Sequence, residues 1–293
     1  MDLYYSFLSD VGNVRDHNED FLYAGKLKSG HYLFIVADGM GGHSAGEVAS
    51  YHAVTGFIKA LKKGIGDNIT EELRQIVLDI NEKLIHEGEK KDILRGMGTT
   101  LSVLYIKDCL GYIVHVGDSR IYRYSEPYKE LEQLTEDHSL VGKLLKDGFI
   151  SLEEAQAHPK RNVLYQSVGL KKEIEVQAMG PFRVREGQKF VLCSDGLNNE
   201  LIDSEIMEFL KLPSTRQSVE GLLKRVKAGA AMDNITVIVV STVKSDDDEA
   251  DPMEDTVKLT VPIQIIKKRK KKIILFLLLG LLVLLLLSAF FLL

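Results

Sequence analysis

The sequence predicts a fold of the α+β class, in which helices cover antiparallel sheets. Between residues 99 and 134, short segments rich in β-branched and aromatic residues follow one another across turns, as the strands of an antiparallel sheet do. A doubly wound parallel sheet would instead need a helix between successive strands. With 293 residues, of which 45% are hydrophobic and 27% are charged, the chain has enough apolar side chains for a full core.

Seven segments have the apolar, β-branched or aromatic composition of strands. They cover residues 4–9, 32–37, 99–106, 111–116, 121–124, 189–193 and 235–242. Six further segments are predicted helices, namely residues 45–63, 70–87, 139–146, 152–158, 203–210 and 218–228. Two of the helix starts have the spacing of a capping box, Ser151 with Glu154 and Asn68 with Glu71.

Charge and cysteine content restrict the classes of function and the compartment. Residues 1–243 carry 29 basic and 35 acidic residues, a formal charge of −6. A mildly acidic body is a poor nucleic-acid binder, so no nucleic-acid partner is expected, and it suits a site that concentrates divalent cations. Cys109 and Cys193 lie in apolar, strand-like segments of a chain with no secretory signal at its N-terminus. We expect both to be reduced core residues in a cytosolic compartment.

Residues 244–293 differ in composition from the rest of the chain. Residues 273–293 form an apolar run of 21 residues that is interrupted only by Gly280, Ser288 and Ala289. At 1.5 Å per residue this run matches the roughly 30 Å hydrocarbon core of a bilayer, and it lacks the polar stripe of a buried helix. We therefore expect a single membrane span.

A basic run, residues 267–272, stands directly before this segment. By the positive-inside rule, the run places everything N-terminal to it on the cytoplasmic side of the cell membrane. An acidic block and two prolines mark residues 244–266 as a tether. The predicted organisation is a folded domain, residues 1–243, an acidic-then-basic tether, residues 244–272, and a C-terminal transmembrane helix, residues 273–293.

Four aspartates recur at the ends of apolar, strand-like segments, namely Asp38, Asp118, Asp195 and Asp233. A strand end holds a carboxylate rigidly at the edge of a sheet, and a following glycine lets a backbone carbonyl or a ligand approach. Several carboxylates without cysteine or a paired histidine set are typical ligands of hard cations such as Mg²⁺ or Mn²⁺. A single Asp-Gly is typical of a hairpin turn, but four such aspartates favour a metal site.

Eight short motifs follow one another in order over essentially all of residues 1–243. They are Arg-Asp-His-Asn-Glu-Asp (15–20), Val-Ala-Asp-Gly-Met-Gly-Gly-His (36–43), Gly-Glu-Val-Ala-Ser (46–50), Gly-Met-Gly-Thr-Thr (96–100), Gly-Asp-Ser-Arg (117–120), Leu-Thr-Glu-Asp-His-Ser (134–139), Ser-Asp-Gly-Leu (194–197) and Asp-Asn-Ile-Thr-Val (233–237). This series resembles the bacterial type 2C (metal-dependent, PPM-type) Ser/Thr protein phosphatases. The resemblance implies a four-layer α/β/β/α sandwich of two antiparallel sheets flanked by helices, with metal ions at one end.

The resemblance also implies a two-metal site for Mn²⁺ or Mg²⁺. Asp38 would bridge the two ions, with the Gly39 carbonyl on one of them. Asp195 and Asp233 would complete the shell of the other ion. Two such ions can bind a shared water, lower its pKa and direct an in-line attack on phosphorus.

Further roles follow from the same resemblance. Glu19 and Asp20 would hold the first ion, partly through water, and Asp118 matches the position that supports a weaker third ion in bacterial members. Arg15 would bind the phosphate, because a guanidinium matches two phosphate oxygens at once. Arg120, the neighbour of Asp118 in the Gly-Asp-Ser-Arg motif, is expected to be structural.

One position departs from the animal members of the family. These members have a histidine directly after the Asp-Gly pair that corresponds to Asp38-Gly39. Here that place is Met40, which cannot donate a proton, and the nearest histidine of the motif is His43. Two candidates remain for the general acid, a metal-bound water and His43, and we favour the water.

Three interpretations of function are compatible with these motifs. The leading one is a phosphoserine/phosphothreonine phosphatase that opposes a eukaryotic-like Ser/Thr kinase and acts on phosphorylated proteins at the membrane. The second is a phosphatase of a regulatory protein in a partner-switching pathway, an enzyme that usually has a sensor domain ahead of the catalytic one. The third is a catalytically inactive membrane-tethered scaffold, which the intact Asp38, Asp195 and Asp233 disfavour.

Overall fold

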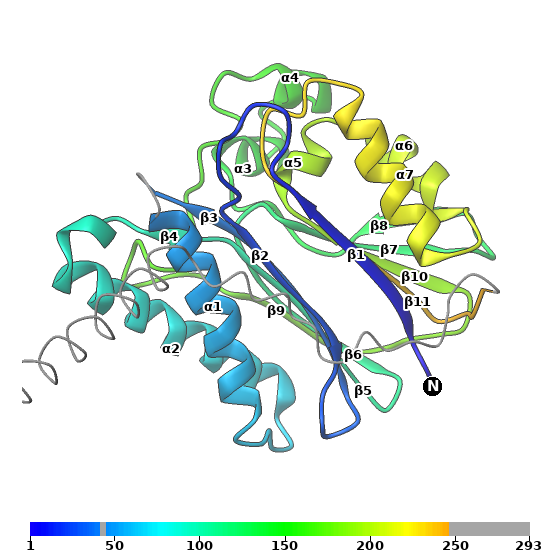
Figure 1. Ribbon diagram of the computed structural model, residues 1–293, viewed down its shortest axis with the longest axis horizontal. Helices are drawn as coiled ribbons and strands as arrows, with labels where there is room; N and C mark the ends of the chain where they lie inside the picture. The colour runs from blue at the N-terminus through cyan, green and yellow to red at the C-terminus, as the bar shows by residue number, and fades with distance from the viewer. Residues whose placement is uncertain (42–44, 246–293) are drawn as a thin grey trace, which may run out of the picture. The chain divides into compact units, whose positions relative to one another are not determined.

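Two antiparallel sheets form the centre of the part of the chain that the computed structural model describes, residues 1–41 and 45–245 (Figure 1). The five-stranded sheet has the order β1 (Tyr4–Asp10), β11 (Ile235–Ser241), β10 (Gln188–Cys193), β7 (Arg120–Ser125) and β8 (Glu130–Gln133). The six-stranded sheet has the order β2 (Asp20–Lys26), β3 (Tyr32–Met40), β5 (Leu101–Lys107), β6 (Leu110–Val116) and β9 (Gln177–Arg183), with the short β4 (Gly98–Thr99) paired to β3.

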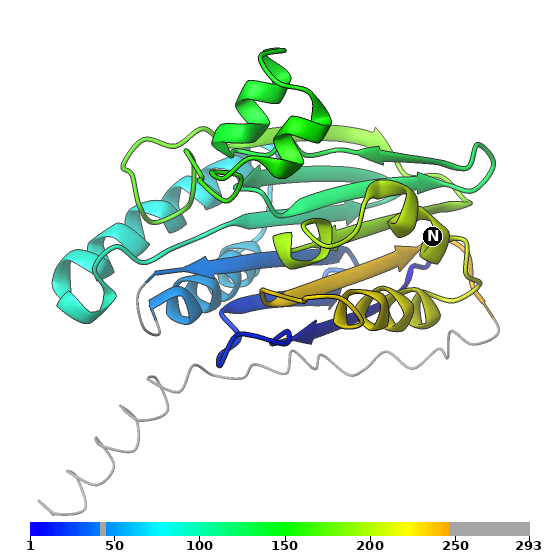
Figure 2. The same ribbon diagram turned by 90° about the horizontal axis from the view of Figure 1, so that it is seen from above.

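Helices cover the outer face of each sheet (Figures 1 and 2). The six-stranded sheet carries α1 (Ala45–Leu61) and α2 (Ile69–Lys90), and the five-stranded sheet carries α6 (Asp203–Leu210) and α7 (Thr215–Lys227). The remaining short elements are η1 (Asp92–Leu94), α3 (Leu140–Lys146), α4 (Leu152–Ala157) and α5 (Asp195–Asn198). Three buried clusters, one between the sheets and one under each pair of helices, join four layers. The α+β class and the sandwich of two antiparallel sheets flanked by helices are therefore confirmed.

The strand β3 is central to this packing. Residues 33–37 are fully buried, because alternate side chains point into two different cores. Leu33, Ile35 and Ala37 face the helices, whereas Phe34 and Val36 face the other sheet. A strand covered on both faces has a continuous apolar sequence, and here that sequence ends at Asp38.

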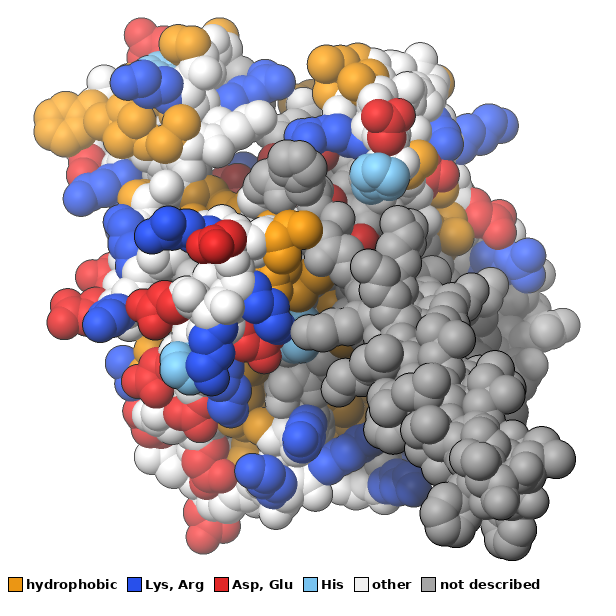
Figure 3. Space-filling model, turned by 60° about the vertical axis from the view of Figure 1, so that its left-hand side comes forward, with side chains coloured by type: hydrophobic (Ala, Val, Ile, Leu, Met, Phe, Trp, Pro, Cys, Tyr) orange, Lys and Arg blue, Asp and Glu red, His pale blue; other side chains and the backbone are white. Residues whose placement is uncertain are grey.

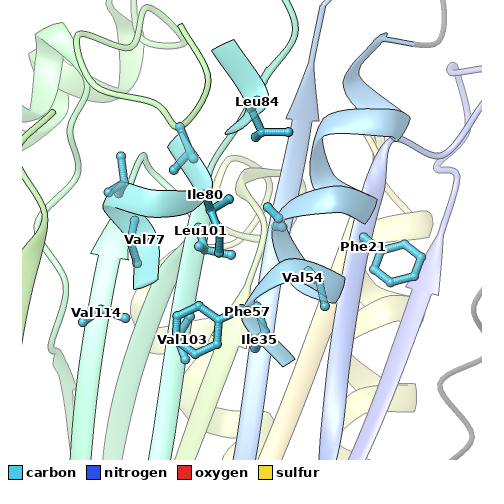
Figure 4. Close-up of a cluster of buried hydrophobic side chains, with 14 of the residues drawn as sticks. Phe21, Ile35, Val54, Phe57, Val77, Ile80, Leu84, Leu101, Val103 and Val114 are labelled. Atoms are coloured by element: carbon cyan, nitrogen blue, oxygen red, sulfur yellow. The ribbon is translucent and has the colours of Figure 1, made fainter. Parts of the chain in front are cut away.

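The helix-facing core shows the 3.6-residue periodicity of amphipathic helices. In α2, Leu73, Val77, Ile80 and Leu84 lie on one buried stripe. Figure 4 shows Val77 and Ile80 of α2 and Val54 and Phe57 of α1 pointing toward Ile35, Leu101, Val103 and Val114 of the sheet.

The predicted strands and helices are present, with ends that differ by a few residues, but six elements of the described residues were not predicted as separate elements. They are β2, β4, β8, β9, α5 and η1. β8 is only four residues long and carries two exposed glutamates, and β9 is an edge strand that contains Gly180 and Pro181. Such sequences have weak strand signals because their stability comes from tertiary packing.

One of the two predicted capping boxes is confirmed. The Glu154 N–H donates to Ser151 Oγ (3.2 Å) and the Ser151 N–H donates to Glu154 Oε2 (2.8 Å). The prediction for Asn68 is wrong, because its side chain makes no cap hydrogen bond at the start of α2. Glu72 instead accepts from the Gly66 N–H (2.8 Å) and so fixes the preceding turn.

Both cysteines are free thiols. Cys193 is buried in β10, as expected of a core residue. Cys109 is not a core strand residue: it lies partly exposed in the turn between β5 and β6, with a φ of +64°. The apolar neighbours of Cys109 belong to the strands on either side of the turn, which explains the wrong prediction.

No helix within residues 1–41 and 45–245 is long and apolar enough to cross a bilayer. The predicted membrane span, 273–293, and nearly all of the predicted tether lie outside the described residues. The domain boundary at residue 243 stays a prediction.

Figure 3 shows Lys/Arg and Asp/Glu side chains intermixed over one face of the molecule.

Candidate metal centre

The register of β2 and β3 brings two carboxylates together. Asp20 is the antiparallel partner of Asp38, so both side chains leave the sheet on the same side. The backbone of Asp38 is fixed on its other edge, because its N–H donates to Thr100 Oγ1 (2.8 Å) and its carbonyl accepts from the Thr100 N–H (2.8 Å). Two like charges directly opposite each other are unfavourable unless a positive group compensates them.

Ser194 links this pair to the five-stranded sheet. Its Oγ donates to Asp20 Oδ2 (2.7 Å) and accepts from the Thr236 N–H (2.9 Å). The next residue, Asp195, begins α5 at the end of β10, and Asn199 Nδ2 donates to its Oδ2 (2.9 Å). Strand ends from both sheets thus place carboxylates at the same end of the sandwich.

Two carboxylate oxygens here are buried and have no hydrogen-bond donor in the described part of the chain. They are Asp20 Oδ1 and Asp195 Oδ1, on residues that are each only 8% exposed. A buried charged oxygen without a partner costs free energy, so such atoms call for a positive ligand. A set of oxygen donors suits Mg²⁺ or Mn²⁺ in particular. On this observation the residues present fit a divalent cation.

Burial, and after it the charges of neighbouring carboxylates, raise the pKa of three aspartates in this site. Burial is the main cause that raises the pKa of Asp20 to about 7, against the hydrogen bond from Ser194. Burial and the charge of Asp233 raise the pKa of Asp195 to about 6. Burial and the charges of Asp20 and Asp195 raise the pKa of Asp38 well above its ordinary value. These three residues are hereafter the buried cluster, and a nearby cation would favour their ionised forms.

Two glycines let β3 and the start of α1 come unusually close. A Cβ at Gly39 would clash with the Gly46 carbonyl, and a Cβ at Gly46 would lie 2.7 Å from the Gly39 carbonyl oxygen. The Glu19 carboxyl carbon would lie 2.9 Å from that Gly46 Cβ, and the Glu19 carbonyl accepts from the Gly39 N–H (3.2 Å). Burial raises the pKa of Glu19 to about 7, against the charge of Arg15. The structure therefore makes Glu19 and Gly39 neighbours, as the predicted first metal shell requires.

Arg15 and Asp233 form an exposed pair beside the buried cluster. Arg15 Nη2 lies 2.8 Å from Asp233 Oδ2, and their side chains are 53% and 31% exposed. The Arg15 charge also acts to lower the pKa of Glu19 and of Asp195. The guanidinium is therefore close enough to these carboxylates to interact with them electrostatically.

Asp118 follows β6 in a bend at Gly117, whose φ is +117°. Burial and the charge of Asp195 raise the pKa of Asp118 well above its ordinary value, which places it electrostatically with the buried cluster. Arg120 is engaged elsewhere: its Nε and Nη2 donate to Asp137 Oδ1 (2.9 Å) and Oδ2 (2.7 Å). This bidentate contact supports the structural role expected of Arg120.

The sequence did not reveal the groups that position these carboxylates, and Asn234 is the clearest case. Its Oδ1 accepts from the Glu19 N–H (2.8 Å), and its Nδ2 donates to the carbonyls of Val11 (3.0 Å) and His17 (2.9 Å). One buried amide thus fastens the loop that carries Arg15 and Glu19 to the loop that carries Asp233. Asn234, Ser194 and Thr100 each stand beside a motif aspartate or within a motif, which is the only signal for them in the sequence.

The described residues, 1–41 and 45–245, contain no group of three or more His, Cys, Asp or Glu side chains already arranged as metal ligands. The charges of Asp20 and Asp195 raise the pKa of Asp38, and Asp233 forms an ion pair with Arg15. His43, one of the two candidates for the general acid, lies outside the described residues.

Known proteins resemble the chain over most of its length. Residues 13–234 match the family described as protein phosphatase 2C. The chain is 40% identical over 245 residues to protein phosphatase PhpP of Streptococcus pneumoniae serotype 2 (strain D39 / NCTC 7466), a match that covers 82% of this chain and 98% of that protein.

Solved structures give the same result. The crystal structure of the Mycobacterium tuberculosis serine/threonine phosphatase PstP/Ppp has a TM-score of 0.75 and 35% identity, over 82% of this chain and 98% of that one. The catalytic domain of serine threonine protein phosphatase PstP in complex with two manganese ions has a TM-score of 0.72 and 34% identity, over 83% and 99%. The chain therefore belongs to the metal-dependent protein phosphatase 2C family and is a protein serine/threonine phosphatase.

Proposed function

We propose that this enzyme hydrolyses phosphoserine and phosphothreonine in proteins with two divalent cations, Mn²⁺ or Mg²⁺, held by the buried cluster and its neighbours. The observation that carries the proposal is the pair of buried oxygens, Asp20 Oδ1 and Asp195 Oδ1, that have no donor among the described residues. They lie in a group of mutually repelling carboxylates beside a half-exposed arginine.

The proposed ligands divide between the two ions as follows. Asp38 would contribute to both sites, Asp20, Glu19 and the Gly39 carbonyl would hold one ion, and Asp195 and Asp233 would hold the other. Asp118 would support a weaker third ion. When bound, such ions supply a water of lowered pKa and positive charge that stabilises the phosphoryl oxygens.

The chain itself supplies orientation. Arg15 presents a guanidinium at the edge of the site, where it can donate two parallel hydrogen bonds to phosphate oxygens. Asn234 holds the Arg15 loop at a fixed distance from Asp233 through its three hydrogen bonds. Ser194 and Thr100 hold Asp20 and Asp38 in place. The protein groups are thus positioned before substrate binds, which lowers the entropy lost on reaching the transition state.

The test is the hydrolysis of a phosphothreonine peptide by the purified full-length protein. We expect turnover with Mn²⁺ or Mg²⁺ and none in excess chelator, and activity should return when the metal is restored. Full activity in excess chelator would contradict the two-metal proposal.

We also propose that the enzyme is anchored in the cell membrane by residues 273–293, with its catalytic domain in the cytoplasm and a Ser/Thr kinase and its substrates as partners. The support is the apolar run of 21 residues and the basic run before it. Confinement near a membrane raises the effective concentration of the enzyme toward membrane-bound phosphoproteins.

A comparison of the full chain with a chain that ends at Val243 tests this anchor. We expect the full chain to stay with membranes after carbonate extraction and the shorter chain to be released. In cells, the shorter chain should also leave membrane-bound phosphoproteins more highly phosphorylated. Equal release of both chains would rule out the anchor.

A further inference from the structure

Two exposed apolar side chains flank the exposed pair. Val14 precedes Arg15 and is 56% exposed, and Met232 precedes Asp233 and is 57% exposed. Single exposed apolar residues are ordinary on a protein surface. These two come from segments 218 residues apart and adjoin the two partners of one ion pair.

One backbone contact and one side-chain contact align the two segments that carry Val14 and Met232. The Asn13 N–H donates to the Ala231 carbonyl (2.9 Å), and Arg15 binds Asp233 two residues further along each segment, so the contacts bracket Val14 and Met232.

Other contacts make both loops rigid. Asn13 Nδ2 donates to the carbonyls of Lys227 (3.2 Å) and Gly229 (3.4 Å), and the Met232 N–H donates to Glu200 Oε1 (3.3 Å). Gly12, with a φ of +81°, allows the close approach, because a Cβ there would clash with the Asp233 carbonyl. A surface held in this way loses little conformational entropy when it binds a partner.

We propose that Val14 and Met232 form an apolar shoulder that takes an apolar side chain next to the phosphorylated residue of the substrate. A phosphate held by Arg15 brings the peptide chain to which it is esterified across residues 14 and 232. Successive residues are about 3.8 Å apart, so the contacting side chain lies one or two positions from the phosphoresidue. The favoured substrates are thus phosphoproteins with Leu, Ile, Val, Met or Phe at such a position. This inference rests on the proposed function.

The size of the shoulder favours a peptide side chain over a second copy of the chain. Two side chains offer far less than the roughly 1,200–2,000 Å² that a stable protein–protein interface buries. One apolar residue of a peptide matches their area, and the phosphate contact with Arg15 supplies the rest of the affinity.

The experiment compares two phosphothreonine peptides that differ only in having Leu or Ser on both sides of the phosphoresidue. The full-length protein is assayed with saturating Mn²⁺, and so is the double variant Val14→Thr/Met232→Gln, which keeps shape and removes apolar character. We expect the wild-type protein to prefer the Leu peptide about tenfold in kcat/KM, which equals about 1.4 kcal/mol. The double variant should reduce this ratio to below about twofold, within the change that loss of about two buried methylene contacts explains.

Ile93→Thr is the matched control, because Ile93 is also exposed, at 63%, but lies in η1. It should keep the tenfold ratio. Equal use of the two peptides by the wild-type protein, or a ratio that survives in the double variant, overturns the inference. So does a wild-type dimer in sedimentation that the double variant abolishes while the ratio is unchanged, since the shoulder would then be a self-association surface. If the wild-type protein hydrolyses neither peptide with Mn²⁺, the proposed function fails and this inference falls with it.

Discussion

The buried cluster and the exposed pair are neighbours at one end of the sandwich, yet they are built in opposite ways. Asp20, Asp38 and Asp195 lie among fixed backbone groups, repel one another and leave two oxygens without a donor. Arg15 and Asp233 are partly in solvent and satisfy each other. An exposed ion pair contributes only about 0–1 kcal/mol to stability, whereas buried like charges are destabilising. Neither region is built for stability, so the difference fits the two proposed tasks: the buried cluster, with Asp233 at its edge, would bind cations, and Arg15 would meet the substrate.

The largest expected effect comes from removing the shared ligand of the buried cluster. Asp38→Ala should lower kcat by roughly 10³-fold or more, because the metal centre supplies several kcal/mol of transition-state stabilisation and each 1.4 kcal/mol is a factor of ten. The measurement is steady-state hydrolysis of a phosphothreonine peptide at saturating Mn²⁺. Thermal unfolding of the metal-free variant should show an intact fold, and a variant that stays folded with more than a tenth of the wild-type kcat would contradict the assignment.

A smaller effect, of a different kind, is expected at the exposed pair. Arg15→Ala should lower kcat/KM by about 10–100-fold, the range for loss of charge-assisted hydrogen bonds, with most of the change in KM. Arg15→Lys should recover part of the loss, because it keeps the charge and loses the planar fork. A fall in kcat with unchanged KM would place Arg15 with the buried cluster and erase the distinction between the two regions.

The contact that joins the two regions gives a third prediction. Asn234→Asp keeps the acceptor for the Glu19 N–H but loses both donors, to the Val11 and His17 carbonyls. We expect kcat/KM to fall about tenfold, consistent with one or two hydrogen bonds lost at about 1 kcal/mol each. Asp16→Asn, at an exposed position of the same loop, is the control and should change kcat/KM less than twofold. Equal effects of the two substitutions would show that Asn234 does not position the loop.

The smallest effect concerns stability and pH in the metal-free protein. The pKa of Asp20 in the folded state, about 7, lies above its ordinary value of 3.8. The folded state therefore binds more protons than the unfolded state between these values, and this contribution to stability is lost as pH rises from about 4 to about 7.

The amide that Asp20→Asn introduces does not ionise, so the variant avoids the loss of stability that the wild-type protein undergoes as pH rises. Without metal at pH 8, the variant should melt on the order of 5 °C higher than the wild-type protein, and at pH 4 the two should melt within about 2 °C of each other. Added Mn²⁺ should stabilise the wild-type protein more than the variant. If the variant melts lower than the wild-type protein at pH 8 without metal, the buried cluster is not under the repulsion inferred here.

The contrast between the two regions also explains what the sequence could predict. The run from Phe34 to Asp38 has a strong signal, because a strand buried on both faces must be apolar until it ends in a functional group. Asp38 and Asp195 were found in this way, whereas Asp20 was assigned only through the resemblance to the family. β2 gave no such signal, because it begins at Asp20 and its partner strand fixes its place.

The positioning groups could not be predicted, because their role depends on contacts between distant segments. Asn234 and Glu19 are 215 residues apart, and Ser194 and Asp20 are 174 residues apart. Nothing in the local sequence of Asn234 states which loop its amide fastens. The salt bridge between Arg15 and Asp233 was likewise invisible, although both residues were singled out as functional. Residue types reveal donors and charges, and only the fold reveals their partners.

The most direct test of the account is a calorimetric titration of the metal-free, full-length protein with Mn²⁺. We expect two ions per chain in the wild-type protein, loss of both in Asp38→Ala, and retention of both in Arg15→Ala. That outcome would separate the cation-binding carboxylates from the substrate-binding Arg15. An Asp38→Ala variant that binds Mn²⁺ with the wild-type stoichiometry and affinity would contradict the central claim.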